Sequence, residues 1–302
     1  MKVLNFSIAD HANFSHNNAT ALRTVGVDCV DIKLRHHPFK YESESVVVEN
    51  TDVSDIFDKY DIIQIMHSDV EYIHLCIEKK KKFVVYHTGS NYRDNPDKFN
   101  EKSKDASLIF TDQCEFMSLV PPGSHYIATA VDVNKYTPVY KSLPHYNLAH
   151  FPSNIPTKGT SDIVRMIAPL ANQCNFTYSQ DKIPHSEQIK RMSKCDIYIE
   201  LFKLELNGRP YGCYGVTAFE AAALGKIVVT NNIFPSAYAS TYGHCPFVIA
   251  NTEEDFFNSI QLLILSQPDY ITSLQKDHRA CMEQNHSFQA TGERLKGLLE
   301  SI

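Results

Sequence analysis

Short apolar runs alternate with amphipathic stretches along most of the chain. In the first half, apolar runs typical of strands lie at Val3–Ile8, Cys29–Leu34, Ile62–Met66, Phe83–His87, Leu108–Thr111 and His125–Ala128. Between some of these runs, apolar residues recur at a spacing of three to four, which predicts helices at Asn17–Val25 and Val70–Glu78. The alternation predicts right-handed βαβ units, in which helices cover a parallel sheet.

The same alternation restarts after a break between Asp132 and His145, where two prolines and weak periodicity indicate a linker. Beyond it we expect strands at Asn147–Phe151, Asn175–Tyr178, Ile197–Leu201, Ile227–Thr230 and Phe247–Ile249. Helices are expected at Ser161–Leu170, His185–Ser193, Val216–Leu224 and in three stretches from Glu253 to Ile302. The pattern therefore predicts an α/β protein of two doubly wound domains, residues 1–140 and 141–302, with a helical C-terminus.

Composition and charge exclude some classes of function. The chain has 302 residues, 43% hydrophobic and 21% charged, which suits two globular domains. Its 29 basic and 35 acidic residues give a net charge of −6, which removes the electrostatic argument for a dedicated polyanion binder.

Cysteine spacing and hydropathy bear on the compartment. The eight cysteines form no C-x-x-C motif, so neither a zinc site nor a disulfide framework is indicated, and we expect a cytoplasmic protein. No apolar run approaches the roughly 20 residues that span a bilayer. The opening stretch MKVLNFSIADHANF has no cleavage pattern behind it, so it is interpreted as a first strand and not as a signal peptide.

The most informative stretch is NGRPYGCYGVTAFEAAALGKIVVTN, residues 207–231. Its glycines Gly208, Gly212 and Gly215 form a turn whose backbone amides can approach a phosphate, and the following helix directs its positive end there. Glu220 lies one turn into that helix, within reach of the hydroxyls of a bound ribose. The alternative is a buried crossover with an incidental glutamate, and the pattern alone does not separate the two.

This stretch resembles the donor-site signature of the family 4 glycosyltransferases, which are retaining enzymes of the GT-B fold with two facing Rossmann-like domains. Glu220 matches the second glutamate of the family's E-x7-E motif, which implies a contact with the ribose of the nucleotide. The first glutamate should stand at Gly212, so the chain departs from the pattern, whereas Tyr214 and Gly215 fit a G-x-Y-G version. The resemblance then implies that the ligand contact of the first carboxylate is made instead by the backbone amides of residues 213–216, including Val216.

A second match is HFPSNIPTKGT, residues 150–160, which resembles the loop that opens the family's second domain. There Lys158 aligns with a lysine that neutralises the donor pyrophosphate, and Ser153 belongs to the same donor loop. Departure of a nucleoside diphosphate needs a fixed cation near the leaving oxygens, although an exposed lysine before a turn is the common alternative. The resemblance also implies that the backbone of Ile183 faces the nucleotide base and that Glu200 borders the sugar.

The candidate catalytic histidine lies in FVVYHTGSNYR, residues 83–93. The strand ends there, so His87 is expected at the carboxyl edge of the sheet, where α/β proteins hold ligands. The resemblance implies that this histidine orients the sugar; a loop hydrogen bond is the alternative. His67, at the end of the preceding strand, is the lesser candidate, and Ser68 and Asp69 are expected to cap the next helix.

The first loop, ADHANFSH, lacks the Gly-Gly usual in the family. It offers His11, Asn13 and Ser15 as polar contacts to a phosphate or an acceptor, whereas Asp10 is interpreted as a cap. Residues 31–40, DIKLRHHPFK, would lie at the edge of the cleft and meet an anionic acceptor, with a solvated loop as the alternative.

Other motifs are missing from the sequence. There is no D-x-D, no G-x-G-x-x-G, no P-loop pattern and no G-x-S-x-G, which disfavours metal-dependent donor binding and the dinucleotide, P-loop and hydrolase classes. The fourteen histidines, including His36 and His37, lack the spacing of metal ligands. We therefore expect no metal and no cofactor apart from the nucleotide-sugar co-substrate.

Together these features predict a retaining hexosyl- or pentosyltransferase with a metal-independent site in the cleft between its domains. The donor, expected to be a UDP-sugar, binds the second domain near Glu220, with His87 and Lys158 as the catalytic residues. The acceptor binds the first domain, and the segment ending at Ile302 resembles the family's last helix, which packs back on that domain.

The acceptor stays open. One hypothesis is a glycan or a lipid-linked sugar. The other is a hydroxymethylated base in DNA, as in large bacteriophages, because the small size and the Asn/Lys/Tyr-rich sequence fit a viral gene acting in the host cytoplasm. The net charge of −6 weighs against DNA. A nucleotide-sugar epimerase and a catalytically silent sugar-nucleotide-binding protein are further alternatives on the same architecture.

Overall fold

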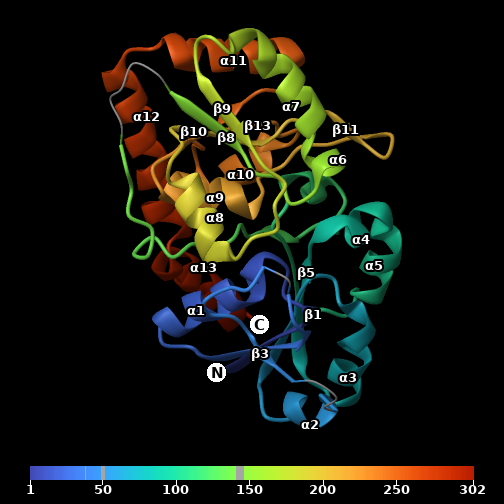
Figure 1. Cartoon of the computed structure of the whole chain (residues 1–302). Coiled ribbons are helices and arrows are strands. Elements are labelled where there is room, and N and C mark those ends of the chain that lie inside the picture. The colour runs from blue at the N-terminus through green and yellow to red at the C-terminus, as the bar shows by residue number, and fades with distance from the viewer. Residues whose placement is uncertain (38, 49–51, 141–145) are drawn as a thin grey trace. The chain divides into compact units, whose positions relative to one another are not determined.

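Two parallel sheets divide the chain into two units. The structure is a computed structural model that describes residues 1–37, 39–48, 52–140 and 146–302. Unit 1 consists of Met1–Asp132 together with His286–Ile302, and unit 2 consists of Val133–Asn285 (Figure 1). Both units are Rossmann-like and the chain ends in helices, so the predicted α/β class is confirmed.

Unit 1 contains a seven-stranded sheet in the order β3-β2-β1-β4-β5-β6-β7, and its neighbouring strands are parallel. The strands are β1 Lys2–Ala9, β2 Asp28–Arg35, β3 Val46–Val47, β4 Ile62–Ile65, β5 Lys82–His87, β6 Leu108–Thr111 and β7 His125–Tyr126. The strand order reverses beside β1: β2 and β3 follow on one side of it, and β4 to β7 follow on the other. Ligands of open α/β sheets bind at the carboxyl ends of the strands at such a reversal.

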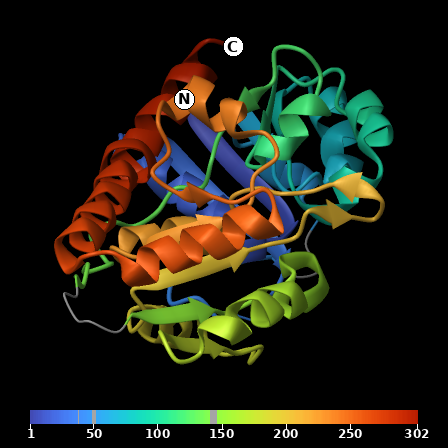
Figure 2. The same ribbon diagram turned by 90° about the horizontal axis from the view of Figure 1, so that it is seen from above.

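Helices cover both faces of this sheet. The α-helices are α1 Phe14–Thr24, α2 Ser54–Phe57, α3 Ile73–Glu78, α4 Gly89–Asp94, α5 Pro96–Lys102 and α13 Phe288–Glu300, and the short 3-10 helices are η1 His11–Asn13, η2 Val70–Tyr72 and η3 Cys114–Ser118. Val3 of β1 packs with α1 and α13, whereas its neighbour Leu4 packs with α2 and α3 on the other face. Both chain ends belong to unit 1 and lie close together in Figures 1 and 2.

Unit 2 contains a five-stranded parallel sheet in the order β14-β13-β10-β8-β9. The strands are β8 Asn147–His150, β9 Asn175–Tyr178, β10 Ile197–Leu201, β13 Ile227–Thr230 and β14 Val248–Ile249, and a separate hairpin joins β11 Glu205–Leu206 to β12 Arg209–Pro210. Central strands β10 and β13 are buried along their whole length. Their residues are therefore apolar at nearly every position, whereas apolar and polar residues alternate along a strand whose sheet has one solvent-exposed face. Glu200 in β10 is the charged exception.

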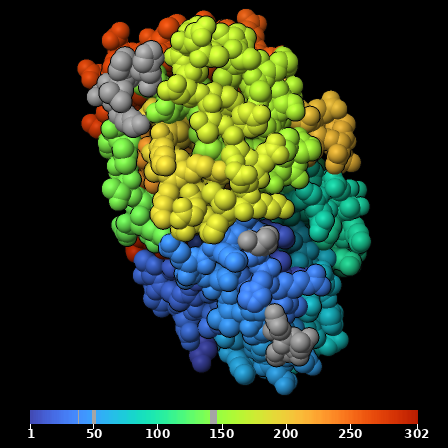
Figure 3. Space-filling model, in the orientation of Figure 1, coloured from blue at the N-terminus to red at the C-terminus, as the bar shows by residue number. Residues whose placement is uncertain are grey.

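The helices of unit 2 follow the predicted alternation. They are α6 Ile155–Lys158, α7 Thr160–Ile167, the 3-10 helix η4 Ala168–Leu170, α8 His185–Met192, α9 Val216–Ala223, α10 Pro235–Tyr242, α11 Glu253–Leu265 and α12 Pro268–Cys281, which leads into a π-helical stretch, η5 Met282–His286. In Figure 3, the yellow-green segment that includes β9 and α8 covers much of unit 2 on the visible face.

Unit 2 begins at Val133, ahead of the predicted boundary at residue 140. Arg279 of α12 donates to the carbonyl oxygens of Val133 and Tyr136, at 2.7 Å each, and Lys226 Nζ donates to the carbonyl of Val139 at 3.0 Å. These cations hold the segment before residue 140 on unit 2. Residues 141–145 of the predicted linker lie outside the described residues.

No helix within the described ranges is both long and apolar enough to cross a membrane. All eight cysteines are free thiols.

Helices α1 and α13 of unit 1 approach each other closely at Gly292. A Cβ atom built on Gly292 would lie 2.1 Å from the carbonyl oxygen of Ala21 and 3.0 Å from Val25 Cγ1. Glycine inside a helix is otherwise unfavourable, so its presence here is explained by backbone contact between the helices. Gly297 lies on the same helix, and a Cβ there would meet no atom within 4 Å.

We expect Gly292→Ala to lower the free energy of unfolding by about 1–3 kcal/mol, because the added methyl group forces α13 away from α1. The matched variant Gly297→Ala should raise it by about 0.5–1 kcal/mol, because alanine has the higher helix propensity. Urea denaturation followed by circular dichroism measures both changes. Equal effects of the two substitutions would contradict the packing described here.

Candidate functional site

The Gly-rich turn of unit 2 ends at the N-terminus of α9. Gly215 precedes the helix in an extended conformation, with φ −84° and ψ 162°, and supplies no capping side chain. Gly215, Val216 and Thr217 are each partly exposed, although the rest of α9 is buried. The positive end of the helix dipole is thus accessible where the sequence predicted a phosphate.

A lysine and a glutamate meet directly beside Gly215. A Cβ on Gly215 would lie 2.0 Å from Glu200 Oε1 and 2.8 Å from Lys158 Nζ, so no other residue fits without displacing them. Lys158 Nζ donates to Glu200 Oε1, and Thr217 Oγ1 donates to Glu200 Oε2. The structure thus brings the candidate residues Lys158, Glu200 and Gly215 together, next to Val216, and adds Thr217, which sequence reasoning missed.

The loop after β8 holds Lys158 in this position. Asn154 Oδ1 accepts from the amide of Thr157 at 3.1 Å and caps α6, and Gly159 ends the helix with φ +68°. A Cβ on Gly159 would lie 1.8 Å from the carbonyl oxygen of Phe202, whose amide donates to the carbonyl of Lys158 at 3.1 Å. At Lys158 and Gly159, the backbone of this loop is therefore in close contact with the backbone at the end of β10.

Glu220 lies on the second turn of α9 and is 6% exposed. Its Oε1 is 2.7 Å from His185 Nε2 and accepts from the Tyr136 hydroxyl at 3.4 Å. The carboxylate predicted to hold a ribose is thus oriented by the first residue of α8. Sequence reasoning missed His185 because its partner is 35 positions away and follows no motif spacing.

The surroundings of Gly212 leave no room for a side chain at that position. A Cβ on Gly212 would lie 2.3 Å from Asn231 Nδ2, which donates to the carbonyl of Tyr211 at 2.7 Å. A side chain at position 212 would therefore break the hydrogen bond that shapes the turn. Tyr214 is 1% exposed and its ring packs in the core, 5.2 Å from Phe247, so its contribution to a ligand site is limited to the backbone.

The remaining predicted donor contacts lie on loops of unit 2. Ser153 is exposed directly after β8, and Ile183 is half-buried in the connection between β9 and α8.

In unit 1, His67 and Asp10 pair at the carboxyl edge of the sheet. His67 Nε2 is 3.1 Å from Asp10 Oδ1, and its Nδ1 is 3.0 Å from Thr88 Oγ1. Asp10 also accepts from the amides of Ser15 at 2.8 Å and His16 at 3.0 Å, so it caps α1 as predicted. The pair lies after β1 and β4, the strands at which the strand order reverses.

The backbone around His67 is strained. His67 and Ser68 have φ values of +55° and +61°, in the left-handed region that costs a non-glycine residue about 1–2 kcal/mol. Such strain is concentrated at functional sites. Asp69, predicted to cap the next helix, instead accepts from the amide of Ile8 at 2.6 Å.

Burial and neighbouring charges shift the pKa values of the ionisable groups at this edge. Burial alone would lower the pKa of His67, but the hydrogen bond and charge of Asp10 outweigh it and raise the pKa. Burial would raise the pKa of Asp10, but His67 and two backbone amides lower it. Burial raises the pKa of Asp69 to about 7 and that of Asp112 to about 6. The edge therefore holds a charged His67–Asp10 pair beside two carboxyl groups that titrate near neutrality.

His87 ends β5 at the carboxyl edge of the sheet, where the sequence placed it, but its side chain is enclosed within unit 1. Its side chain is fully buried, with Nδ1 3.2 Å from Ser68 Oγ and Nε2 3.1 Å from Ser103 Oγ. Its ring stacks on Tyr92 with centroids 4.3 Å apart, and burial lowers its pKa to about 3. Helix α4 supplies Tyr92, and Ser103 comes directly after α5. These two helices follow the strand and cover its end.

Residues of the first loop divide between core and surface. Ser15 is fully buried on α1, and Asn13 is 7% exposed, with its Nδ2 donating to the carbonyl of Ser43 at 2.9 Å. His11 is exposed, and its ring lies edge-on to His67 and to His37, with centroids 5.4 Å and 5.6 Å away. Of the three predicted contacts, His11 alone presents an exposed side chain beside the His67–Asp10 pair.

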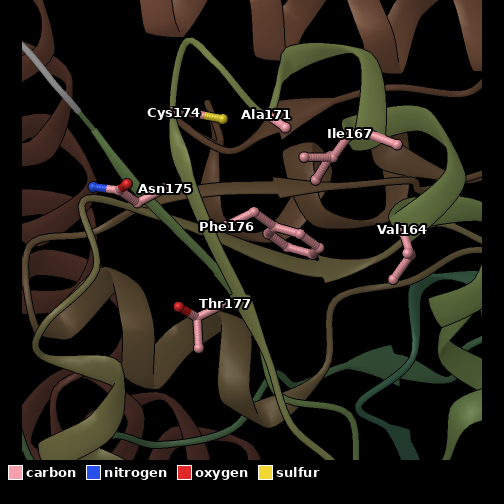
Figure 4. Close-up of a pocket in the computed structure, with 8 residues that line it drawn as sticks. Val164, Ile167, Ala171, Cys174, Asn175, Phe176 and Thr177 are labelled. Carbon is pink, nitrogen blue, oxygen red and sulfur yellow. The ribbon is translucent and has the colours of Figure 1, made fainter.

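A separate hollow of about 510 Å³ lies on unit 2 between α7 and β9 (Figure 4). It is lined by Val164, Ile167, Ala168, Ala171, Cys174, Asn175, Phe176 and Thr177. The lining carries no charged group and shares no residue with the Lys158–Glu200 pair. In the described part of the chain, no three His, Cys, Asp or Glu side chains are grouped so that they could hold a metal ion.

Known proteins resemble this chain in fold and not in sequence. No family model matches the chain, and no curated protein matches it. HepE from Anabaena, solved with UDP, superposes with a TM-score of 0.71 at 14% identity over 100% of both chains. Sucrose-phosphate synthase from Thermosynechococcus elongatus gives 0.65 at 10% identity over 100% of this chain and 99% of the other. The glycotransferase of kitacinnamycin gives 0.51 at 10% identity over 98% of each. These likenesses establish the GT-B fold.

We expect NMR titration of the imidazole groups to separate the two histidines of unit 1. His67 should lose its proton above the ordinary value of 6.5, whereas His87 should stay neutral down to about pH 3. The charge on His67 therefore stabilises the fold fully below pH 6.5, and this contribution is lost as the pH rises through the raised pKa.

Asp10→Asn serves as the control for this titration. It should lower the pKa of His67, because burial then dominates, and leave His87 unchanged. A His87 that titrates near 6.5 would show that its ring is not enclosed as described.

Proposed function

We propose that the protein is a nucleotide-sugar-dependent glycosyltransferase whose donor binds unit 2 at the start of α9. The proposal rests on one observation: Lys158 lies against the N-terminus of α9 at Gly215. A side chain at position 215 would block this close approach of the lysine to the helix. A fixed cation and a helix N-terminus together suit a diphosphate. Glu220, oriented by His185, is the proposed partner of the ribose hydroxyls.

UDP is the proposed nucleotide. The similarity in fold to HepE, whose solved structures contain UDP and UDP-glucose, supports it, as does the fold shared with sucrose-phosphate synthase. The transferred group is proposed to be a hexosyl or pentosyl group.

The proposed reaction retains the configuration of the sugar. The bond between the anomeric carbon and the diphosphate oxygen breaks, and a bond from that carbon to the acceptor oxygen forms on the same face. The proton of the acceptor hydroxyl passes to the departing diphosphate. Lys158 and the N-terminal amides of α9 stabilise the charge that develops on the leaving oxygens.

We propose His67, in place of His87, as the catalytic histidine on the acceptor side. The hydrogen bond and charge of Asp10 raise its pKa and so favour the charged ring, and Asp10 and Thr88 fix its orientation. A ring held in this way donates a directed hydrogen bond to a substrate hydroxyl once it exchanges one partner. Exposed His11 beside it is the proposed acceptor contact.

Nucleotide binding tests the donor site. We expect UDP to raise the melting temperature of the wild-type protein by mass action. Lys158→Ala should weaken UDP binding roughly 10- to 100-fold, since about 1.4–2.7 kcal/mol of charge-assisted interaction is lost. Lys190→Ala is the matched control, because Lys190 is an exposed lysine of the same unit that pairs with Glu187 at the surface. Equal losses in both variants, or no response to any nucleoside diphosphate, would end the donor assignment.

Turnover tests the acceptor side. With a UDP-sugar and a panel of sugars, lipid-linked sugars and duplex DNA with hydroxymethylated bases, His67→Gln should lower kcat roughly 100-fold or more and leave UDP affinity unchanged. His74→Gln, an exposed histidine of α3 in the same unit, should behave like wild type. Conversion of the UDP-sugar without any acceptor would instead indicate an epimerase, and UDP binding without any conversion would indicate a silent binding protein.

A further inference from the structure

Glu200 is a charged residue in the middle of a buried strand. Strand β10 is otherwise apolar or aromatic, with Ile197, Tyr198, Ile199 and Leu201 all buried, and Glu200 is 1% exposed. Removing a carboxylate from water is costly unless a cation and hydrogen-bond donors compensate for it. Its neighbours must therefore supply that compensation.

Both carboxylate oxygens have partners. Oε1 accepts from Lys158 Nζ, and Oε2 accepts from Thr217 Oγ1, whose residue is the second of α9. The missing side chain at Gly215 lets the carboxylate come against the start of the helix, where the dipole favours an anion. Glu200 thus has the surroundings that a bound phosphate would have.

We propose that Glu200 is a built-in counter-ion that competes with the diphosphate of the donor for Lys158. This inference rests on the proposed donor site. Lys158 Nζ is paired with Glu200 in the ligand-free protein, so it must exchange that partner for phosphate oxygens when a donor binds. When the diphosphate product leaves, Glu200 takes Lys158 back, and the competition favours product release.

The charges at the site determine whether removing the Glu200 carboxylate strengthens or weakens the binding of an anion. Lys158 and Glu200 cancel, so a diphosphate meets the helix N-terminus and a lysine that is already neutralised. His150, whose imidazole is near the pair, is held neutral, because burial lowers its pKa to about 4. Removing the charge of Glu200 without changing its shape should therefore leave Lys158 fully available to an anion.

This role differs from a contact between Glu200 and the sugar, which the resemblance implied. A sugar contact predicts that loss of the carboxylate weakens donor binding and leaves inorganic pyrophosphate unaffected. A counter-ion predicts that the same change tightens the binding of pyrophosphate, which has no sugar. Local misfolding would weaken binding of both, so only the counter-ion gives a gain.

The test is calorimetric titration of wild type, Glu200→Gln and Glu283→Gln with inorganic pyrophosphate and, separately, with UDP. Glu200→Gln should bind pyrophosphate at least about tenfold more tightly, because the ligand no longer displaces a buried carboxylate. Glu283→Gln is the matched control: it removes the same charge from an ion pair with Arg279, which also donates to the carbonyl of Ala223 at the opposite end of α9. Its affinity should match wild type.

Glu200→Asp gives a second measurement should the glutamine variant fail to fold. It keeps the charge but withdraws it by one methylene group, and pyrophosphate affinity should fall between wild type and the tenfold gain. Unchanged or weaker pyrophosphate binding in the folded Glu200 variants, or no binding in any of them, overturns the counter-ion. The predicted gain with pyrophosphate, without binding of any nucleoside diphosphate, would support the counter-ion and overturn the proposed function.

Discussion

The ion pair between Lys158 and Glu200 is the interaction on which the candidate donor site depends. The Glu200 side chain is fully buried and that of Lys158 is 16% exposed, so the charge of Glu200 alone would be strongly destabilising there. The pair forms because three backbones give it room. Gly215 carries no side chain, Gly159 turns the loop against Phe202, and α9 begins where the carboxylate lies. The glycines recognised in the sequence therefore serve close contact as much as chain flexibility.

The two units use a helix N-terminus at a sheet edge in different ways. In unit 1, Asp10 follows its own strand and accepts from the first amides of α1, so that helix end is already occupied by a cap. In unit 2, Gly215 brings no capping side chain, and the nearby carboxylate comes from a different strand, paired with a lysine. The two carboxylates therefore differ in what they bond: Asp10 accepts from the amides of α1 itself, whereas Glu200 accepts from the Thr217 side chain and from Lys158. In the proposed function, this difference is why the diphosphate is assigned to unit 2 and not to unit 1.

Periodicity predicted the fold well because both sheets are parallel and buried, so strands and helices have distinct patterns. The turn before α9 was predicted because its glycines and Glu220 are close together in sequence. Which histidine has a charged partner was not predictable in this way. His67 lies just after β4 and His87 ends β5, and both side chains are largely buried, but only His67 lies against a carboxylate, that of Asp10. Helices α4 and α5 pack over His87 instead. Partners such as His185 and Thr217 were missed because their contacts are made through tertiary structure, with no fixed spacing to read.

The turn at Gly212 and the strand β10 differ in whether they can bring a carboxylate to the start of α9. Asn231 occupies the space of any side chain at that position and bonds the carbonyls of Tyr211 and Lys203, so a carboxylate cannot enter from the turn itself. A carboxylate nevertheless reaches the start of α9, from Glu200 on β10. Because β10 is a central strand held on both sides by β8 and β13, this carboxylate is fixed by the sheet and not by a mobile turn. In the proposed donor site, a carboxylate anchored in this way gives place to a diphosphate only if the lysine moves, so the flexible side chain of Lys158 is the part expected to respond to the donor.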